Sequence, residues 1–167
     1  MTDYYNISSN FSEDQKLIQS SIRAWVDKSI KPEIGRFYQR GEPFPNLASQ
    51  LAEIGAFGLI IPQEHGGFGL DYMSYGLLMQ ELERGDTSLR VMSSIQTSLV
   101  MYAIDQFGSE EQKTKYLPKL ATGELLGAFG LTEPDFGSNT ASMHCHYVED
   151  GDHISISGSK MWIGNSS

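Results

Sequence analysis

The chain has 167 residues, a formal net charge of −9, and the 40% hydrophobic and 20% charged composition of a globular protein. Such acidity argues against a nucleic-acid partner, because phosphate binding needs clustered Lys and Arg. The single cysteine, Cys145, allows no internal disulfide and fits a reducing compartment. The N-terminal stretch shows no export or transit pattern, and no apolar run is long enough to cross a bilayer. We therefore expect a cytoplasmic protein with no membrane contact.

The first two thirds of the sequence have helical spacing. Ser12 and Gln15 form a capping-box pattern, and apolar residues at helical intervals follow as far as Val26. Pro32 is expected to stop this first helix, and the Pro- and Gly-containing stretch 41–46 reads as a connector.

A short helix is expected over 47–54. Gly55 fits the left-handed position that closes such a helix. The following stretch LIIPQEHGGFGLD, at 59–71, is interpreted as a loop, because proline and three glycines interrupt its apolar residues.

Two longer helices are predicted over 71–85 and 87–108. Asp71 and Thr87 are placed to cap their first turns, and a glycine stands at the end of each. The letters SEEQ at 109–112 form a second capping box and predict one more helix.

After this helix, which Pro118 is expected to bend or end, the hydrophobic period changes. Stretches 125–131, 143–148 and 153–157 have the pattern of β-strands, and 149–152 reads as a hairpin turn between the last two. The predicted fold class is therefore mainly α with a C-terminal β portion.

This change divides the chain into two predicted domains, a helical one at 1–124 and the beginning of a β domain at 125–167. Strands so close to the end of the chain have few partners, and a small hairpin sheet is marginal alone. We therefore expect the sequence to be the front part of a longer protein.

Two motifs carry the functional interpretation. Residues 127–139 read GAFGLTEPDFGSN and residues 157–165 read SGSKMWIGN. Either stretch alone is an ordinary strand end or turn. Together, T-E-P, G-S and K-x-W-I in this order resemble the paired flavin-binding segments of acyl-CoA dehydrogenases. The similarity also includes IPQEHGG and FGSEEQKTKYLPKLATGE, and it is greatest to the glutaryl-CoA dehydrogenases of that family.

The resemblance implies the acyl-CoA dehydrogenase fold, with an N-terminal helical domain before a middle β-barrel domain, and FAD as the cofactor. It places the Thr132 hydroxyl and nearby backbone at the flavin, Gly137 and Ser138 in a turn beside it, and Trp162 against its ring. The complete set of cofactor residues that it implies is Phe129, Leu131, Thr132, Gly137, Ser138, Trp162, Ile163 and Gly164.

The resemblance also implies an acyl-CoA substrate, with Arg90, Glu83 and Ser138 as the substrate-binding residues. Arg90 matches the arginine that binds the distal carboxylate of glutaryl-CoA, and a guanidinium can grip a carboxylate through two parallel hydrogen bonds. Two other interpretations stay open: Arg90 is an ordinary solvated helix residue, and Glu83 pairs with a helix neighbour or water.

Several residues depart from the family pattern. Gly164 stands where Thr or Ser is usual, whose hydroxyl can hydrogen-bond the flavin N5, and Asn139 replaces a common aspartate. Val91 stands where glutaryl-CoA dehydrogenases have a small hydroxyl residue. His144 and His146 share one face of a predicted strand, but no further ligands converge on them, so no metal site is predicted.

The predicted function is a segment of an FAD-dependent acyl-CoA dehydrogenase that converts glutaryl-CoA to crotonyl-CoA. No catalytic residue is assigned, because the glutamate base of the family is expected beyond residue 167, and this chain alone is expected to be inactive. The resemblance further implies an electron-transfer flavoprotein as acceptor and a homotetramer. Three alternatives remain: a dehydrogenase of a short monocarboxylic acyl-CoA, a flavin oxidase or monooxygenase of the same fold, and a non-catalytic module.

Overall fold

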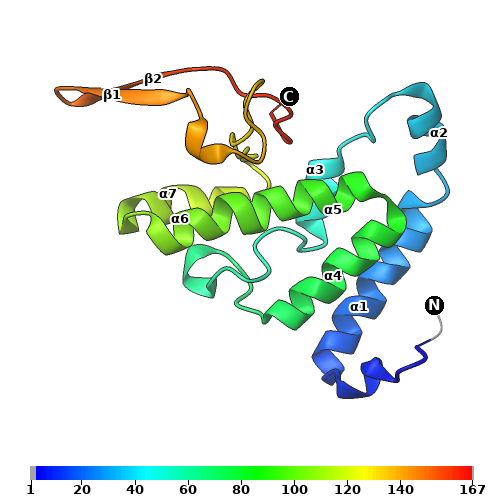
Figure 1. The fold of residues 1–167 in the computed structure, drawn as a ribbon. Coiled ribbons are helices and arrows are strands. Elements are labelled where there is room, and N and C mark those ends of the chain that lie inside the picture. The colour runs from blue at the N-terminus through cyan, green and yellow to red at the C-terminus, as the bar shows by residue number, and fades with distance from the viewer. Residues whose placement is uncertain (1–2, 167) are drawn as a thin grey trace.

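A computed structural model describes residues 3–166, which form a body of helices with a β-hairpin projecting from it (Figure 1). This confirms the predicted mainly helical fold with a C-terminal β portion. The α-helices are α1 (Glu13–Trp25), α2 (Ile34–Arg40), α3 (Leu47–Glu53), α4 (Tyr72–Gly85), α5 (Thr87–Ser94), α6 (Tyr102–Phe107) and α7 (Glu110–Ala121). Shorter 3-10 turns are η1 (Ile7–Asn10), η3 (Gln63–His65) and η5 (Thr140–Ser142), and π-helical stretches are η2 (Val26–Ile30) and η4 (Ile95–Met101).

Both predicted capping boxes are present. The hydroxyl of Ser12 accepts a hydrogen bond from the amide of Gln15, whose side chain accepts one from the amide of Ser12. Ser109 and Gln112 repeat the arrangement at the start of α7. Each box satisfies two amides that have no partner within the helix, so local sequence alone determines where α1 and α7 begin.

Three local predictions need correction. Asp86, not Thr87, caps α5, because its carboxylate accepts a hydrogen bond from the amide of Ser88. Pro118 does not end a helix, since α7 continues to Ala121. Helix α2 was not predicted, because it is only seven residues long, contains a glycine and follows closely on Pro32.

The main core lies where α1, α4 and α5 pack together (Figure 1). Each large aliphatic or aromatic side chain that is fully buried contributes about 1.5–3 kcal/mol. A second cluster joins the loop before η3 to η4 and α7. The first cluster includes Val26, Ile30, Leu51, Phe57, Leu78, Leu82 and Leu89, and the second includes Ile61, Met101, Leu117 and Leu120.

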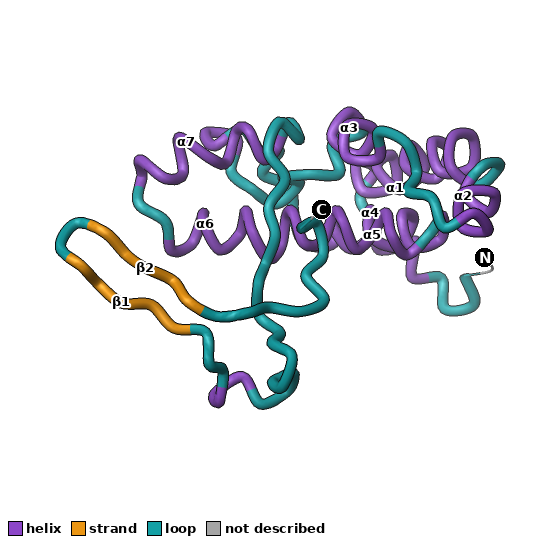
Figure 2. The backbone as a smooth tube through the Cα atoms, turned by 90° about the horizontal axis from the view of Figure 1, so that it is seen from above, coloured by secondary structure: helices purple, strands orange, loops and turns teal. Residues whose placement is uncertain are grey.

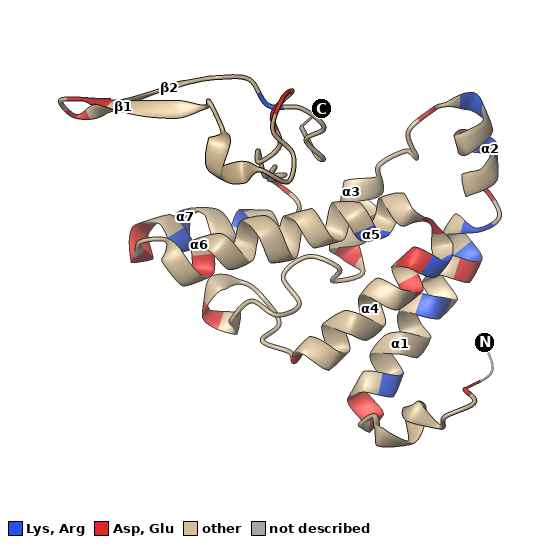
Figure 3. Cartoon of the chain, viewed as in Figure 1, with Lys and Arg blue, Asp and Glu red and all other residues tan. Residues whose placement is uncertain are grey.

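Charged residues gather where α1 and α4 lie side by side (Figure 3). The buried carboxylate of Glu81 accepts hydrogen bonds from Arg23 at 2.6 Å and from Arg84 at 2.7 Å. Arg84 also reaches Asp27 at 2.7 Å. This cluster compensates a carboxylate that could not be buried alone without a large desolvation cost.

One helix, α5–η4–α6, runs continuously under the C-terminal part of the chain (Figure 1). Its π-helical stretch is anchored to the loop after α3. The hydroxyl of Thr97 accepts a hydrogen bond from the amide of Gly58 at 3.2 Å, and that of Ser93 donates to the carbonyl of Ala56 at 2.6 Å. We call this helix the platform, because it supports the segments described below.

The hairpin consists of β1 (His146–Asp150) and β2 (His153–Ser157), which pair antiparallel with Asp150 opposite His153. Gly151 has a φ of +60°, as the tight turn between the strands requires. Every residue of both strands is exposed, and the hairpin extends away from the helices (Figure 2).

The other predicted strands do not form as expected. Stretch 125–131 forms no strand, and the amide of Gly127 instead donates to the side chain of Gln96 at 2.8 Å. The predicted strand 143–148 begins only at His146. Apolar alternation favours an extended backbone, but strand formation also needs a neighbouring strand to complete the ladder.

Candidate functional site

The two sequence motifs lie against each other. We call residues 127–138 the TEP segment and residues 158–165 the KMW segment. The amide of Met161 donates to the carbonyl of Thr132 at 2.9 Å, and the ammonium of Lys160 donates to the carbonyl of Leu131 at 3.0 Å. The two segments are thus joined by direct hydrogen bonds, although more than twenty residues separate them in the sequence.

Both segments are fastened to the platform helix. The side chain of Gln96, fully buried on η4, donates to the carbonyls of Leu120 and Leu125 and accepts from the amide of Gly127. The amide of the Asn165 side chain donates to the carbonyls of Met92, at 3.4 Å, and Gly127, at 3.3 Å. The side-chain amides of Gln96 and Asn165 therefore hold the TEP and KMW segments against the platform helix.

Glu133, the middle residue of T-E-P, is 5% exposed. Its carboxylate accepts hydrogen bonds from the amides of His144 and Cys145, both at 2.8 Å, and from Lys160 at 3.0 Å. The His144 amide, followed by the Cys145 amide and Lys160, lowers the pKa of Glu133 to about 2 against the opposing effect of burial. This carboxyl is therefore ionised at neutral pH.

Large apolar side chains stand exposed beside these contacts. Phe129 is 44% exposed, Leu131 39% and Trp162 86%. Trp162 also has a φ of +61°, a left-handed conformation that costs a residue with a bulky side chain roughly 1–3 kcal/mol. The chain thus holds an indole outward at an energetic cost, an arrangement that is commonest at ligand sites.

Two glycines of the TEP segment, Gly130 and Gly137, leave space around these side chains. A Cβ added at Gly137 would meet nothing within 4 Å, and one at Gly130 would meet only Lys160, at 3.5 Å. Ser138 is exposed and Thr132 is half-buried. Aromatic faces, accessible backbone and two hydroxyls fit a flat aromatic group with polar edges, which is the shape and chemistry of a flavin.

Gly164 stands where the family pattern has Thr or Ser, and the space around it is small. A Cβ added there would lie 2.3 Å from Cδ1 of Ile95 on η4, so no side chain fits without displacing Ile95. The sequence identified Gly164 as a departure from the family pattern, and the structure gives the packing reason for it.

Arg90 and Glu83 form an ion pair between α5 and the end of α4. Thr87 also donates to Glu83, at 2.8 Å, and the hydrogen bonds from Arg90 and Thr87 lower the pKa of Glu83. Both charged side chains are partly exposed. The structure therefore brings these two predicted substrate residues together, and it records no hydrogen bond from either to the TEP or KMW segment within residues 3–166.

A cavity of about 690 Å³ lies next to this part of the platform. Val91 and Met92 on α5, Phe37 on α2, and Gly164 and Asn165 of the KMW segment line it. Arg90 itself is not part of its lining. Gly164 is the one predicted site residue in the lining of this cavity. Val91, which also lines it, is a position where the chain departs from the glutaryl-CoA dehydrogenase pattern.

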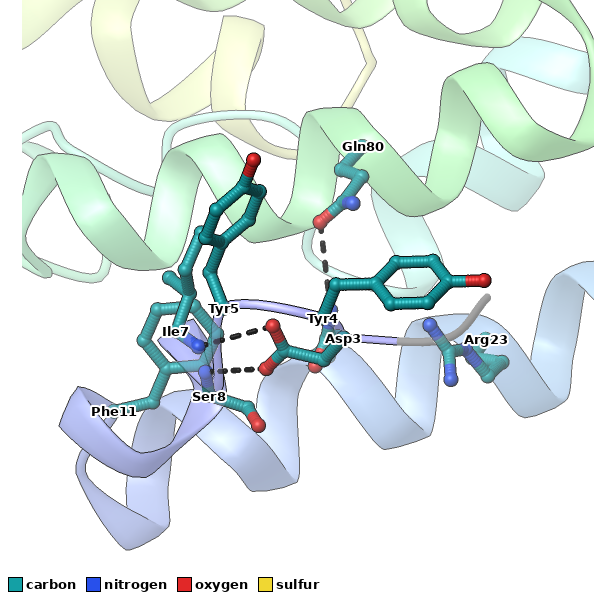
Figure 4. A pocket seen from close by; sticks show the side chains of 9 residues that line it. Asp3, Tyr4, Tyr5, Ile7, Ser8, Phe11, Arg23 and Gln80 are labelled. Atoms are coloured by element: carbon teal, nitrogen blue, oxygen red, sulfur yellow. Dashed lines mark hydrogen bonds between the residues drawn. The ribbon is translucent and has the colours of Figure 1, made fainter.

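Another cavity, of about 790 Å³, lies at the other end of the body between the N-terminal turn and the helices α1 and α4 (Figure 4). Tyr4, Tyr5 and Phe11 line it, and the carboxylate of Asp3 accepts hydrogen bonds from the amides of Ile7 and Ser8. None of the predicted site residues lines it. Its polar atoms stabilise the local turn, and we assign it no ligand.

The histidines of the hairpin do not gather into a metal site. The ring of His144 packs edge-on against Phe136, with ring centroids 4.7 Å apart, and His146 Nδ1 lies 2.9 Å from the carbonyl of His144. No group of three or more His, Cys, Asp or Glu side chains suited to a metal ion occurs within residues 3–166. In the same part of the chain, no helix combines the length and the hydropathy needed to cross a bilayer.

Sequence reasoning missed four residues that build the site, namely Glu133, Lys160, Gln96 and Asn165. A signal existed for Glu133 and Lys160, because each belongs to a motif that was recognised. Asn165 also lies within a recognised motif, as its last residue. Gln96 lies outside both motifs, on a helix face that also buries Ser93 and Thr97.

The comparison with known families identifies the class of protein. Residues 12–124 match the family described as "Acyl-CoA dehydrogenase, N-terminal domain". This match spans more than half of the chain, which therefore belongs to the acyl-CoA dehydrogenase family.

Individual relatives agree on the class but differ in substrate. The chain is 36% identical over 160 residues to a glutaryl-CoA dehydrogenase of Desulfococcus multivorans, covering 94% of this chain and 41% of the relative. It is also 36% identical to a short-chain specific acyl-CoA dehydrogenase of Clostridium acetobutylicum, covering 93% and 41%. A crystal structure of a glutaryl-CoA dehydrogenase from Mycobacterium smegmatis in complex with FADH2 superimposes with a TM-score of 0.91 and 38% identity, covering 95% and 41%. The chain thus spans about 41% of the length of these relatives.

Proposed function

We propose that this chain is the N-terminal part of an FAD-dependent acyl-CoA dehydrogenase that oxidises glutaryl-CoA between its α and β carbons and yields crotonyl-CoA with loss of CO2. The observation that carries the proposal is the direct hydrogen bonding of the TEP segment to the KMW segment beside the exposed rings of Phe129 and Trp162. The chain's similarity to an enzyme that binds FADH2 supports the same cofactor.

FAD would be held by the surface that the two segments share. The exposed rings of Trp162 and Phe129 offer aromatic faces for stacking, and the exposed turn at Gly137 and Ser138 suits anionic oxygens. When bound, FAD supplies the acceptor for the hydride that leaves the substrate's β-carbon. The proposed contacts are Phe129, Leu131, Thr132, Gly137, Ser138, Trp162, Ile163 and Gly164.

The residues of this chain contribute binding and orientation but no assigned base. The substrate's α-proton must be taken by a group within hydrogen-bond reach, and we expect a glutamate beyond residue 167 to do this. Residues 1–167 alone are therefore expected neither to retain FAD through gel filtration nor to oxidise an acyl-CoA. Stoichiometric flavin absorbance together with turnover by this chain would contradict the expectation.

Arg90, Glu83 and Ser138 are the proposed substrate contacts. A carboxylate at the far end of the acyl chain would compete with Glu83 for the partly exposed guanidinium of Arg90, or would share it. The identity to a glutaryl-CoA dehydrogenase supports this substrate.

The test compares Arg90→Met with Arg40→Met, an exposed arginine on α2, in the complete enzyme that contains this chain. Arg90→Met is expected to lower kcat/KM for glutaryl-CoA by about 10- to 100-fold, because a hydrogen bond between charged groups contributes roughly 1.5–3 kcal/mol. Activity on butyryl-CoA and both activities of Arg40→Met should change little. Equal losses on the two substrates would remove the carboxylate-binding role.

A short monocarboxylic acyl-CoA is the second candidate substrate. Two observations favour it: Glu83 already neutralises Arg90, and Val91 offers no hydroxyl. The Clostridium acetobutylicum relative has the same 36% identity to this chain as the glutaryl-CoA dehydrogenase. A higher kcat/KM on butyryl-CoA than on glutaryl-CoA would select this candidate.

The remaining features are proposed from the family resemblance. They are an electron-transfer flavoprotein as acceptor, a homotetramer and, from the single Cys145, a cytoplasmic location. Oxygen consumption during turnover would indicate a flavin oxidase or monooxygenase instead. A complete protein without turnover on any acyl-CoA would indicate a non-catalytic module.

A further inference from the structure

Glu133 and Lys160 belong to the two motifs, yet neither is among the residues assigned to cofactor or substrate. Glu133 follows Thr132, and Lys160 precedes Met161 and Trp162. Their side chains meet at 3.0 Å, with 4% of the Glu133 side chain and 24% of the Lys160 side chain exposed. A charge pair this sheltered is costly to assemble unless further hydrogen bonds satisfy its remaining polar atoms.

The carboxylate of Glu133 uses both of its oxygens. Oε2 accepts the amide of His144 at 2.8 Å, and Oε1 accepts the amide of Cys145 at 2.8 Å as well as the ammonium of Lys160. These two amides immediately precede β1, which begins at His146. Glu133 therefore fixes the point at which the hairpin leaves the body.

The ammonium of Lys160 is equally engaged. Besides Glu133, it donates to the carbonyl of Leu131 at 3.0 Å and lies 3.4 Å from the sulfur of Met143. The next residue, Met161, donates its amide to the carbonyl of Thr132. Three consecutive residues of the TEP segment are thus bound to two consecutive residues of the KMW segment.

We propose that Glu133 and Lys160 are positioning residues that hold the TEP and KMW segments in register and tie the hairpin to both. The pair sets the position of Trp162 relative to Thr132 together with two further hydrogen bonds between the segments, from Met161 to Thr132 and from Asn165 to Gly127. The register itself follows from the hydrogen bonds described above. Its benefit for flavin binding rests on the proposed function.

The experiment measures amide hydrogen exchange and the Trp162 indole resonance by NMR in the 167-residue chain. The variants are Glu133→Gln and Lys160→Met, and the control is Glu149→Gln, an exposed acid on β1. Both variants are expected to speed exchange at His144 and Cys145 by about tenfold or more, since each hydrogen bond to a charged group is lost or weakened. Both should also shift the Trp162 indole resonance.

Two comparisons separate positioning from general loss of structure. Exchange at the buried Leu78 and Leu82 of α4 should remain as in the native chain, which shows that the helical body is intact. Lys160→Arg keeps the charge and should restore most of the protection at Cys145 and the native indole resonance, whereas Lys160→Met should not.

The acid dependence gives a second readout. Because the pKa of Glu133 is about 2, below its ordinary value of 4.5, its contacts are present above pH 4.5 and are lost as the pH falls through 2. Protection of Cys145, relative to its intrinsic exchange rate, should follow this course in the native chain. In Glu133→Gln, protection should not vary over the same range.

Two results would overturn the proposal. Exchange in Glu133→Gln that matches the Glu149→Gln control would show that the carboxylate does not hold the hairpin. Faster exchange with an unmoved Trp162 indole would reduce Glu133 to a local cap of two amides. If exchange and indole behave as expected but the complete protein binds no FAD, only the proposed function fails.

Discussion

At the scale of single residues, space and backbone conformation decide what each motif position can carry. Trp162 adopts a left-handed conformation and remains exposed, while Gly164, two residues later, is pressed against Ile95. The KMW segment therefore presents a large ring outward and allows no side chain inward at 164.

The first prediction concerns Gly164→Ser. Its Cβ would lie 2.3 Å from Cδ1 of Ile95, and overpacking of this kind costs about 1–3 kcal/mol, so the urea midpoint of unfolding should fall. Ile95→Ala removes the obstructing atom, and the double variant should lose less stability than the sum of the two single variants.

Gly137→Ser is the matched control, because a Cβ at 137 meets nothing within 4 Å. Its unfolding midpoint should stay close to that of the native chain. Strictly additive losses in Gly164→Ser and Ile95→Ala would contradict the proposed steric conflict.

At this scale the sequence indicated which residues belong to the motifs, but it did not predict most of the side-chain contacts between them. The motif letters predicted that Thr132 and Trp162 belong to one site. The structure joins the two segments through the hydrogen bond from Met161 to Thr132, and the site itself stays a prediction. Glu83 was interpreted both as a substrate residue and as a partner of a helix neighbour, and the structure pairs it with Arg90 and Thr87. Motifs identify residue types, but contacts between side chains also depend on how the elements pack.

At the scale of elements, the platform helix is the feature on which the site depends. Its π-helical stretch η4 places Gln96 and Thr97 fully inside, where each satisfies backbone groups of a loop. π-Helical stretches within α-helices are frequent at functional sites. Here the stretch holds the first residues of the TEP segment in place.

The second prediction concerns Gln96→Leu, which keeps the size of the side chain but removes its three hydrogen bonds. The amide of Gly127 and the carbonyls of Leu120 and Leu125 would lose their contacts with Gln96. Each buried group left without a partner costs about 1–3 kcal/mol, so a clear fall in the free energy of unfolding is expected.

Urea denaturation followed by circular dichroism measures this loss. Gln106→Leu on α6 is the control, because Gln106 is exposed and contacts only its neighbour Asp105 through its side-chain amide. A Gln96→Leu variant as stable as the control would show that the three contacts contribute little.

Local sequence predicted helix starts better than strands. The caps at Ser12, Asp71 and Ser109 were all identified from the sequence, because a capping side chain bonds to an amide only two or three residues away. Stretch 125–131 was wrongly predicted as a strand, because strand formation depends on a partner that is distant in sequence.

At the scale of the whole molecule, a buried charge cluster joins α1 to α4. Burial tends to raise the pKa of Glu81, but hydrogen bonds from Arg23 and Arg84 outweigh it and lower this pKa below its ordinary value. The contribution of a carboxyl with a lowered pKa is complete above its unfolded pKa and is lost as the pH falls through the folded one.

The third prediction concerns Glu81→Gln, which leaves two arginines without their buried partner. A loss of about 3–5 kcal/mol in the free energy of unfolding is expected at pH 7. The difference from the native chain should shrink as the pH is lowered below 4.5, because protonation then removes the charge of Glu81 in the native chain as well.

Thermal unfolding of both chains across this pH range provides the measurement. Glu124→Gln is the control, because its ion pair with Lys119 is exposed and contributes less than about 1 kcal/mol. A difference that stays constant with pH would contradict the role of the Glu81 charge.

The sequence by itself determined the family, the helical class, the caps and the two motifs. These features depend on residue types at short or fixed spacing, and such spacing is visible along the chain. Only the tertiary structure decided that Glu133 and Lys160 join the motifs, that Ile95 fills the space at Gly164, and that Arg90 pairs with Glu83. Each of these contacts depends on how the elements pack against one another. Packing brings together residues at no regular spacing, so the sequence pattern does not predict which of them meet.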